Sequence, residues 1–158
     1  MAGIVIEAAS ASSKEALLLQ DELSELLLSM NGDSGRASFD GEAPCTRGGF
    51  YIARNDTGAL LGCAALRPLG ADDSTIAELK RMYARPDCCG ARGVGAALLV
   101  YVERQAAAHG YRVVQLSTRR INTRAVDFYA RHGYAEVAPY GKYVTAPQSV
   151  CMGKALAD

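Results

Sequence analysis

Two side chains combine a reactive group with a position that a folded chain could use for chemistry. Glu78 lies in an otherwise apolar, strand-like stretch, 75–83, where a carboxylate is costly to bury without a partner or a wet pocket. Tyr129 lies on a short helical pattern that begins at Asn122, and its phenol can donate a proton to a leaving group of similar basicity. The two could serve as the base and the acid of a transfer reaction. The structural alternatives are a solvent-facing glutamate paired with Lys80 and a core aromatic.

A glycine-rich turn follows that strand at residues 90–95, and a helical pattern then runs to Gly110. Such a turn is a candidate anion site, because the first N–H groups have no partner within the helix and the helix dipole is positive there. Gly93 and Gly95 let the backbone approach an anion, and Arg92 can add a charge-assisted hydrogen bond. The mononucleotide and dinucleotide phosphate motifs both fit poorly, and a purely structural turn is the alternative.

Strand and helix patterns provide the scaffold for these groups. Strand-like runs occur at 4–7, 50–54, 59–66, 75–83, 113–116, 134–137 and 149–152. Helical patterns begin at a capping box formed by Ser12 and Glu15, at Val94 and at Asn122. Residues 32–49 are polar and glycine-rich, and they form either a plain connection, a short helix or a substrate-binding lid. This order predicts a single α+β (mixed α/β) domain over residues 1–158, with three layers: a mixed sheet and helices on both of its faces.

The length and composition exclude several classes of protein. A chain of 158 residues, 49% apolar and 22% charged, suits one soluble globular domain. Its zero formal net charge argues against a general nucleic-acid or membrane-surface binder. The sequence has no signal-peptide pattern and no apolar run of the ~20 residues that a membrane helix needs, so we expect a cytoplasmic protein. Five cysteines without a C-x-x-C pair favour reduced packing residues over disulfides or a metal site.

The other reactive side chains are weaker candidates. His109 and His132 each precede a helix-ending glycine, which is typical of a surface position. Cys151 could be acylated, but the sequence places no histidine beside it, and an activated cysteine needs a neighbouring base or cation. The vicinal pair Cys88–Cys89 is the candidate for a redox test.

Two separate motifs resemble the core of the GNAT (Gcn5-related) N-acetyltransferase family. The first is Glu-Leu-Lys-Arg-Met-Tyr-Ala-Arg-Pro at 78–86, followed by Arg-Gly-Val-Gly-Ala-Ala-Leu-Leu at 92–99. The second is the pattern N-x-x-A-x-x-F-Y-x-x-x-G-[FY] at 122–134. The tail, 139–154, is similar to that of some small bacterial members. The resemblance runs from residue 78 to 134, about half of the chain.

The resemblance implies a mainly antiparallel central sheet, splayed between its fourth and fifth strands, and acetyl-CoA as co-substrate without a metal. The pantetheine arm would lie in that gap and pair with the backbone of Met82 and Ala84. The pyrophosphate would sit on the amides of 91–96, and Asn122 would contact the pantetheine or the acetyl end. The implied cofactor-binding residues are Met82, Tyr83, Ala84, Gly90, Ala91, Arg92, Gly93, Val94, Gly95, Ala96, Asn122 and Tyr129.

Gly90 departs from the family pattern, which usually has Gln or Arg at this position. The anion contact of that side chain is lost, although the backbone amides remain. Arg92 and Arg85 are the candidates to compensate, and we expect cofactor binding to survive with weaker affinity.

The reaction that the resemblance implies is acetyl transfer to a primary amine of a small molecule, amino acid or peptide, by direct attack in a ternary complex. Tyr129 would be the acid and Glu78 the base, and proximity removes the need for a covalent intermediate. The alternatives are a non-catalytic acyl-CoA-binding or regulatory module, and transfer of another acyl group. Many members of the family form dimers, so a homodimer is a possible assembly.

The acceptor pocket would come from irregular segments, and its candidate residues are Arg36, Phe39, Tyr140 and Tyr143. The two tyrosines have packing on the sheet as their alternative. Residues 1–79 hold five basic and twelve acidic side chains, whereas residues 80–131 hold ten basic and three acidic. The basic block coincides with the expected phosphate site, and the acidic half favours a cationic amine as acceptor.

Overall fold

The computed structural model describes residues 3–39, 46–86 and 93–157. Over these ranges the strands are β1 (Val5–Ala9), β2 (Gly49–Arg54), β3 (Leu60–Pro68), β4 (Ile76–Ala84), β5 (Val113–Arg119), β6 (Ala135–Val137) and β7 (Ser149–Ala155). The α-helices are α1 (Lys14–Asn31), α2 (Val94–Ala108) and α3 (Thr123–Arg131), and two short 3₁₀ helices are η1 (Arg36–Ser38) and η2 (Gly141–Thr145).

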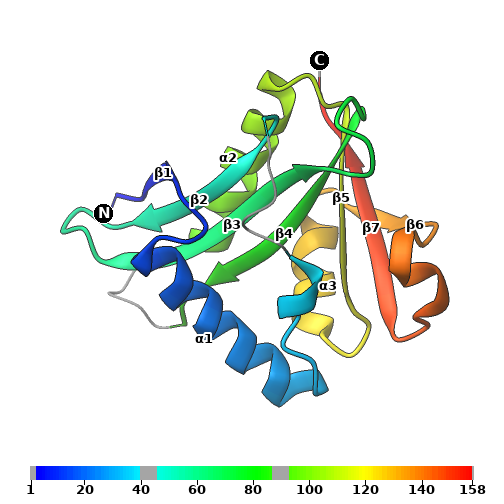
Figure 1. Ribbon diagram of the computed structural model, residues 1–158, viewed down its shortest axis with the longest axis horizontal. Coiled ribbons are helices and arrows are strands. Elements are labelled where there is room, and N and C mark those ends of the chain that lie inside the picture. The colour runs from blue at the N-terminus through cyan, green and yellow to red at the C-terminus, as the bar shows by residue number, and fades with distance from the viewer. Residues whose placement is uncertain (1–2, 40–45, 87–92, 158) are drawn as a thin grey trace.

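All of these strands join one sheet in the order β1-β2-β3-β4-β5-β7-β6 (Figure 1). Neighbouring strands run antiparallel except β4 and β5, which are parallel. These two pair only between residues 76–78 and 113–115, and beyond that point they separate. The sheet is therefore mixed, mainly antiparallel and splayed between its fourth and fifth strands, as predicted.

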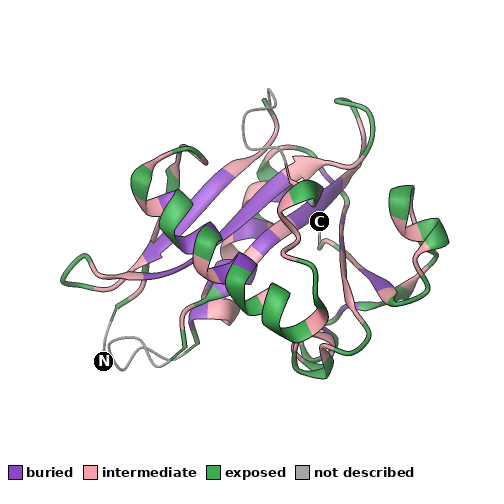
Figure 2. Cartoon of the chain, turned by 60° about the horizontal axis from the view of Figure 1, so that its bottom comes forward, coloured by how far each residue is buried: buried purple, intermediate pink, exposed green. Residues whose placement is uncertain are grey.

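Helices cover both faces of the sheet, which confirms the predicted layers. Alternate residues of β2 lie on opposite faces of the sheet, because successive side chains of a strand point to opposite sides. Phe50 and Ile52 pack with α1, whereas Tyr51 and Ala53 pack in the cluster that includes α2 and α3. In Figure 2 the buried residues concentrate on the central strands, and the outer side of α1 is exposed.

The first helix begins one residue later than the capping box predicts. The Ser13 hydroxyl, not that of Ser12, accepts the hydrogen bond of the Ala16 N–H. Ser12 instead shares a hydroxyl hydrogen bond with Ser10 at 2.9 Å. Only Ser12 has a glutamate three residues later, but either serine can cap a helix, and the sequence does not state which of them has the extended backbone of a cap. The helix ends at Gly32, whose φ of 76° suits a glycine cap.

A β-bulge interrupts the pairing of β3 and β4 beside the gap. Cys63 lies opposite Tyr83 and Ala65 opposite Lys80, so two residues of β4 oppose one residue of β3. Arg81 has φ 53°, which is unusual for a residue other than glycine. As a result, Lys80 and Tyr83 lie on the same face of the sheet as α1, although they are three positions apart.

Helix α2 starts immediately beyond the gap. Gly93 precedes it with φ 74° and provides no side-chain cap. Gly95 lies in its first turn, where a Cβ would meet the Phe128 ring at 3.3 Å. Glycine therefore permits both the left-handed turn and the close approach of α3.

The segments predicted as irregular contain short 3₁₀ helices. Within 32–49, η1 confirms the short-helix alternative for its three residues, while 40–45 lie outside the described residues. The tail forms η2 before β7. Over the described residues, no helix combines the length and the apolar character that crossing a bilayer requires.

Candidate active site

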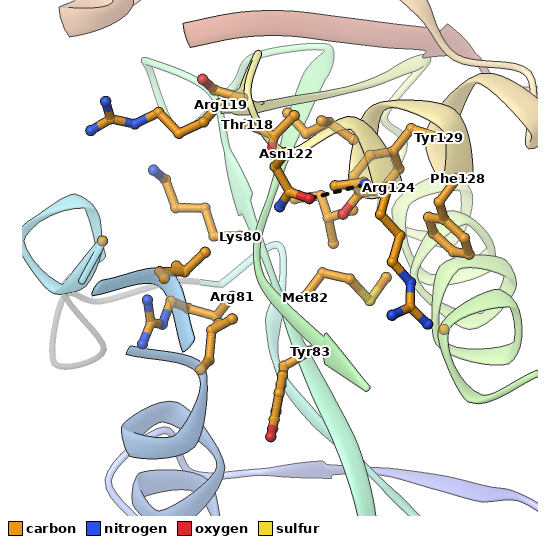
Figure 3. A pocket seen from close by; sticks show the side chains of 18 of the residues that line it. Lys80, Arg81, Met82, Tyr83, Thr118, Arg119, Asn122, Arg124, Phe128 and Tyr129 are labelled. Atoms are coloured by element: carbon orange, nitrogen blue, oxygen red, sulfur yellow. Dashed lines mark hydrogen bonds between the residues drawn. The ribbon is translucent and has the colours of Figure 1, made fainter. Parts of the chain in front are cut away.

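A pocket of about 1140 Å³ lies where β4 and β5 diverge. Its walls come from the second half of α1 and the loop after it, β4, the first turn of α2, the end of β5, α3, and η2 with the residues after it (Figure 3). Glu78 and Tyr129 both line it. The fold thus brings the two predicted catalytic residues to one cavity, from elements on either side of the gap.

Glu78 is 8% exposed, so it is not the solvent-facing residue of the structural alternative, although it does pair with Lys80. The Tyr140 hydroxyl donates to Glu78 Oε2 at 2.9 Å, and Lys80 Nζ lies 3.5 Å from the same oxygen. From the described part of the chain, Oε1 accepts no hydrogen bond. The carboxylate is therefore held through one oxygen and leaves the other for a ligand.

Tyr140 acts on the site through Glu78, because its own side chain does not line the pocket. Burial, followed by the neighbouring Glu78 carboxylate, raises the pKa of Tyr140 far above its ordinary value. Its phenol consequently stays protonated and remains a donor to Glu78. Its ring also packs edge-on against Tyr143, with the ring centroids 5.4 Å apart.

Tyr129 lies on α3 and is 7% exposed. Burial raises its pKa well above the ordinary value, so the phenol is protonated at neutral pH. Its ring packs edge-on against Phe128 and Tyr134. No side chain or backbone group in the described ranges forms a hydrogen bond with its hydroxyl, which leaves it able to donate to a ligand.

Asn122 caps α3, since its Oδ1 accepts the hydrogen bond of the Ala125 N–H at 3.2 Å (Figure 3). The side chain lines the pocket, and its amide nitrogen stays available as a donor. This position fits the contact with the pantetheine or acetyl end that the resemblance implies.

The first turn of α2 lines the other end of the pocket through Gly93, Val94, Gly95 and Ala96. The first N–H groups of a helix lack intrahelical partners, and Gly93 adds no side-chain cap, so this end suits an anion such as a pyrophosphate. Gly90, Ala91 and Arg92 lie outside the described residues.

The arginines near this end differ in how many of their N–H donors already bond other residues of the protein. Arg85 lines the pocket, but its Nε and Nη2 both bond the Glu22 carboxylate at 3.0 Å. It is therefore less free to compensate for Gly90 than the sequence suggests. Arg124 extends from α3 into the same space as Met82 (Figure 3). This residue was not predicted, although its place two residues after Asn122 was a signal for it.

The β4 residues of the implied cofactor site contribute in different ways. Met82 and Ala84 line the pocket beyond the point where pairing to β5 ends. The Tyr83 side chain also contributes to the lining, but its hydroxyl donates to Glu22 at 3.0 Å. Burial and that hydrogen bond raise the pKa of Tyr83 to about 12. We therefore assign Tyr83 a structural role, because its hydrogen bond to Glu22 joins β4 to α1.

The four acceptor-binding candidates separate into two groups. Phe39 and Tyr143 line the pocket. Arg36 does not, and it bonds Asp21 at 2.8 Å on the exposed side of α1. Tyr140 contacts the site only through Glu78. Sequence reasoning missed Ser117, Thr118 and Arg119, which line the pocket from the end of β5. Their position just past the splayed pairing was the signal for them.

The two cysteines in the described ranges do not line the pocket. Cys63 and Cys151 are both buried, and burial raises the pKa of the Cys63 thiol to about 12. Cys45, Cys88 and Cys89 lie outside the described residues. His132 does line the pocket, but its Nδ1 lies 2.8 Å from the Phe128 carbonyl at the end of α3, as a helix-ending histidine would.

Comparison with known proteins agrees with the fold. The sequence profile of the Acetyltransferase (GNAT) family matches residues 19–134. The chain is 31% identical over 107 residues to a protein named IAA acetyltransferase from Azospirillum brasilense, covering 68% of this chain and 67% of that protein.

Two solved structures share the architecture. A protein from Klebsiella pneumoniae, described as an acyl-CoA N-acyltransferase, has a TM-score of 0.82 at 23% identity, with 98% of each chain covered. N-acetylglutamate synthase from Neisseria gonorrhoeae has a TM-score of 0.71 at 17% identity, covering 100% of this chain and 36% of that chain. At such identities the likeness extends to the fold.

Proposed function

The chain belongs to the acetyltransferase (GNAT) family, and from that premise we propose that it transfers the acetyl group of acetyl-CoA to a primary amine of a small molecule, amino acid or peptide. The observation that carries the proposal is one cavity with a buried carboxylate on one wall, a buried phenol on another and a helix N-terminus at one end. The first two groups suit proton transfers, and the third suits the phosphates of a nucleotide-bearing acyl carrier.

The gap between β4 and β5 fits the carrier. The backbone of Met82 and Ala84 faces this gap without a β5 partner, and the first turn of α2 lies beyond them. The N-acetylglutamate synthase of the same fold is complexed with coenzyme A, which supports a coenzyme A site in this architecture. When bound, acetyl-CoA would supply a thioester carbon open to attack by the amine and a sulfur leaving group.

Glu78 and Tyr129 would manage the two protons. Glu78 Oε1 would accept the proton that the ammonium must lose before the nitrogen can form its bond to the carbonyl carbon. Tyr129 would donate its phenolic proton to the sulfur as the carbon–sulfur bond breaks, and the second proton of the attacking nitrogen would return to the phenolate. The products are then an amide and free coenzyme A, with one proton left on Glu78. Holding the amine and the thioester together can itself remove several kcal/mol of the barrier, about 7–11 in the best-oriented cases.

Calorimetry with acetyl-CoA, followed by thiol release and product mass spectrometry against a panel of amines, tests this function. We expect binding and acetylation of at least one primary amine. Propionyl-CoA and succinyl-CoA in the same assay define the acyl group. Binding without transfer to any amine would instead identify an acyl-CoA-binding module, and a lack of binding to every acyl-CoA would overturn the proposal.

A further inference from the structure

Two cations lie at the end of the pocket away from α2. Lys80 comes from β4 and Arg119 from β5, both beyond the residues where these strands pair. Their side chains extend to the same side, on the other side of the view from Tyr129 (Figure 3). Only 15% of the Lys80 side chain and 25% of the Arg119 side chain are exposed. Partly buried charges of one sign at a pocket wall are costly unless a partner or a ligand compensates them.

Arg119 is oriented but not saturated. Its Nη2 donates to Asp33 Oδ2 at 2.9 Å, and Asp33 is itself held by the Gly35 N–H at 2.9 Å. Its Nε and Nη1 form no hydrogen bond with any residue in the described ranges. A guanidinium presents five N–H donors in a planar fork, so the free part of this fork can bind a carboxylate with two parallel bonds.

Lys80 is also underused. Its Nζ lies 3.5 Å from both Glu78 Oε2 and the Tyr143 hydroxyl, which is at the outer limit of a hydrogen bond. An ammonium has three donors. At least one of them can therefore serve a ligand beside Glu78.

Among the described residues that line this end of the pocket, cations outnumber acids. The described lining residues here are the cations Lys80, Arg81, Arg119 and Lys142, against the acids Asp33 and Glu78. Arg81 contributes only charge, because its guanidinium donates to the carbonyls of Gln20 and Ser34 and to the Ser24 hydroxyl. An excess of positive charge favours an anionic group on the ligand.

This electrostatic environment differs from the expectation of a cationic acceptor. That expectation rested on the acidic first half of the chain. Several of those acids lie away from the pocket: Glu7 and Glu15 pair with Arg54, and Asp21 pairs with Arg36. These three carboxylates share two arginines at the surface, outside the pocket lining, and they do not set the charge of the acceptor site.

We propose that the acceptor is an α-amino acid, whose amine lies at Glu78 Oε1 while its carboxylate binds Arg119 and Lys80. The inference rests on the proposed acetyl transfer and narrows its acceptor. Lys80 Nζ lies 3.5 Å from Glu78 Oε2, so an acceptor that contacts both side chains has its amine and its carboxylate close together, as they are when one carbon carries both. The same cations would favour loss of a proton from the acceptor ammonium, which the attack requires.

The test compares the proteinogenic L-amino acids with their carboxamides as acceptors, at saturating acetyl-CoA, in wild type and variants. We expect at least one amino acid to exceed its own amide about tenfold or more in kcat/KM. In Arg119→Gln, and separately in Lys80→Gln, this ratio should fall toward one. Because each ratio uses the same two acceptors, differences in amine basicity cancel between variants.

Two further variants control for folding and for charge. Arg104→Gln removes an exposed cation from α2, outside this pocket, and should keep the wild-type ratio. Asp33→Asn releases Arg119 without removing it, so the preference for the acid should persist. Thermal melts check that every variant is folded.

The outcomes separate the two proposals. Amides or simple amines that match or exceed the acids in wild type overturn the α-amino acid acceptor and leave acetyl transfer standing, as does a preference that both cation variants retain. Failure of wild type to bind acetyl-CoA or to acetylate any amine removes the proposed function itself, and the acceptor inference with it.

Discussion

Tyr129 and Tyr140 show how two buried phenols can have different tasks. Both have a pKa raised by burial, so both remain protonated. The Tyr140 hydroxyl donates a hydrogen bond to Glu78, whereas the Tyr129 hydroxyl has no such partner in the described ranges. The free phenol is the one placed to protonate a leaving group, and the bonded one is placed to orient a base.

Replacement of Tyr129 tests the acid. Tyr129→Phe should lower kcat at least about tenfold, because a positioned general acid contributes ~10²–10⁴-fold. The acetyl-CoA affinity, measured by calorimetry, should change little, since the ring remains in place. Tyr101→Phe is a matched control, because Tyr101 is half-buried against Tyr51 outside the pocket. An unchanged kcat in Tyr129→Phe would remove this residue from the mechanism.

A pH series tests the base and the residue that orients it. Glu78→Gln should lose the acidic limb of kcat/KM. Tyr140→Phe should lower kcat/KM, because the carboxylate loses the hydrogen bond that holds it in position. Tyr143→Phe removes a hydroxyl that contacts Lys80 rather than Glu78, and it should lower kcat/KM less. Superposable profiles for wild type and Glu78→Gln would make Glu78 structural.

At the scale of elements, the turn before α2 combines a left-handed glycine, Gly93, with a proposed ligand contact. Gly93 and Gly58 both have positive φ, 74° and 86°, and at both a Cβ would meet open space. Gly93→Ala and Gly58→Ala should therefore cost similar stability, ~1–2 kcal/mol by denaturant unfolding. Gly58 lies in the β2–β3 hairpin, outside the pocket lining. Weakened acetyl-CoA binding should accompany the Gly93 variant alone, and equal binding by the two would exclude the turn from the site.

The loop after α1 is joined to β5 by the pair of Asp33 and Arg119. The Gly35 amide first, and then Arg119, lowers the pKa of Asp33 below its ordinary value of 3.8. A lowered folded-state pKa means that the stabilisation is present above the unfolded value and is lost as the pH falls through the folded value.

Urea unfolding measures this contribution. Asp33→Asn should be less stable than wild type at pH 7 by the ~0.2–1 kcal/mol that exposed pairs contribute. The difference should begin to shrink as the pH falls below the unfolded value and should vanish below the lower folded value, where Asp33 is protonated in both states. Asp127→Asn, an exposed carboxylate on α3, is the control and should differ little from wild type. A deficit independent of pH would mean that the charge of Asp33 is not its source.

At the scale of the whole molecule, stability depends on the packing of α2 against the sheet. Leu98 is 0% exposed, whereas Leu18 on α1 is 46% exposed. Leu98→Ala should cost ~2–5 kcal/mol in free energy of unfolding, because it leaves a cavity in a close-packed core. Leu18→Ala should stay within ~0.5 kcal/mol. Chemical denaturation of both variants checks the comparison, and similar losses would place the main core on the α1 side instead.

Much of the fold could be predicted from local patterns in the sequence. The apolar run of β2 and the apolar periodicity of α2 are properties of a few neighbouring residues, and both elements occur where predicted. The resemblance supplied the splay of β4 and β5, and it named the candidate acid and base. The cap at Ser13 instead of Ser12 was not predicted, since the sequence offers both hydroxyls.

Contacts between distant segments could not be read in this way. Tyr140 reaches Glu78 across 62 residues, and only the placement of β7 beside β5 brings the tail to that point. The charge of the acceptor end was likewise hidden, because the sums of charge along the chain do not show which acids are paired on the surface. The bulge at Arg81, which puts Tyr83 on the α1 face together with Lys80, depends on pairing with β3.

The divergence of β4 and β5 gives this sheet two edges in its interior in addition to the two at its outline. An open edge is a template onto which another extended chain can add, and it is a hazard for aggregation that sheet proteins usually keep short, charged or covered. If acetyl-CoA binds as proposed, its amide-bearing arm would occupy the place of a missing strand. The co-substrate would then also fill a gap in the sheet while it is bound. Each time coenzyme A left, an edge would be exposed, and the empty protein would have to protect that edge from pairing with another extended chain.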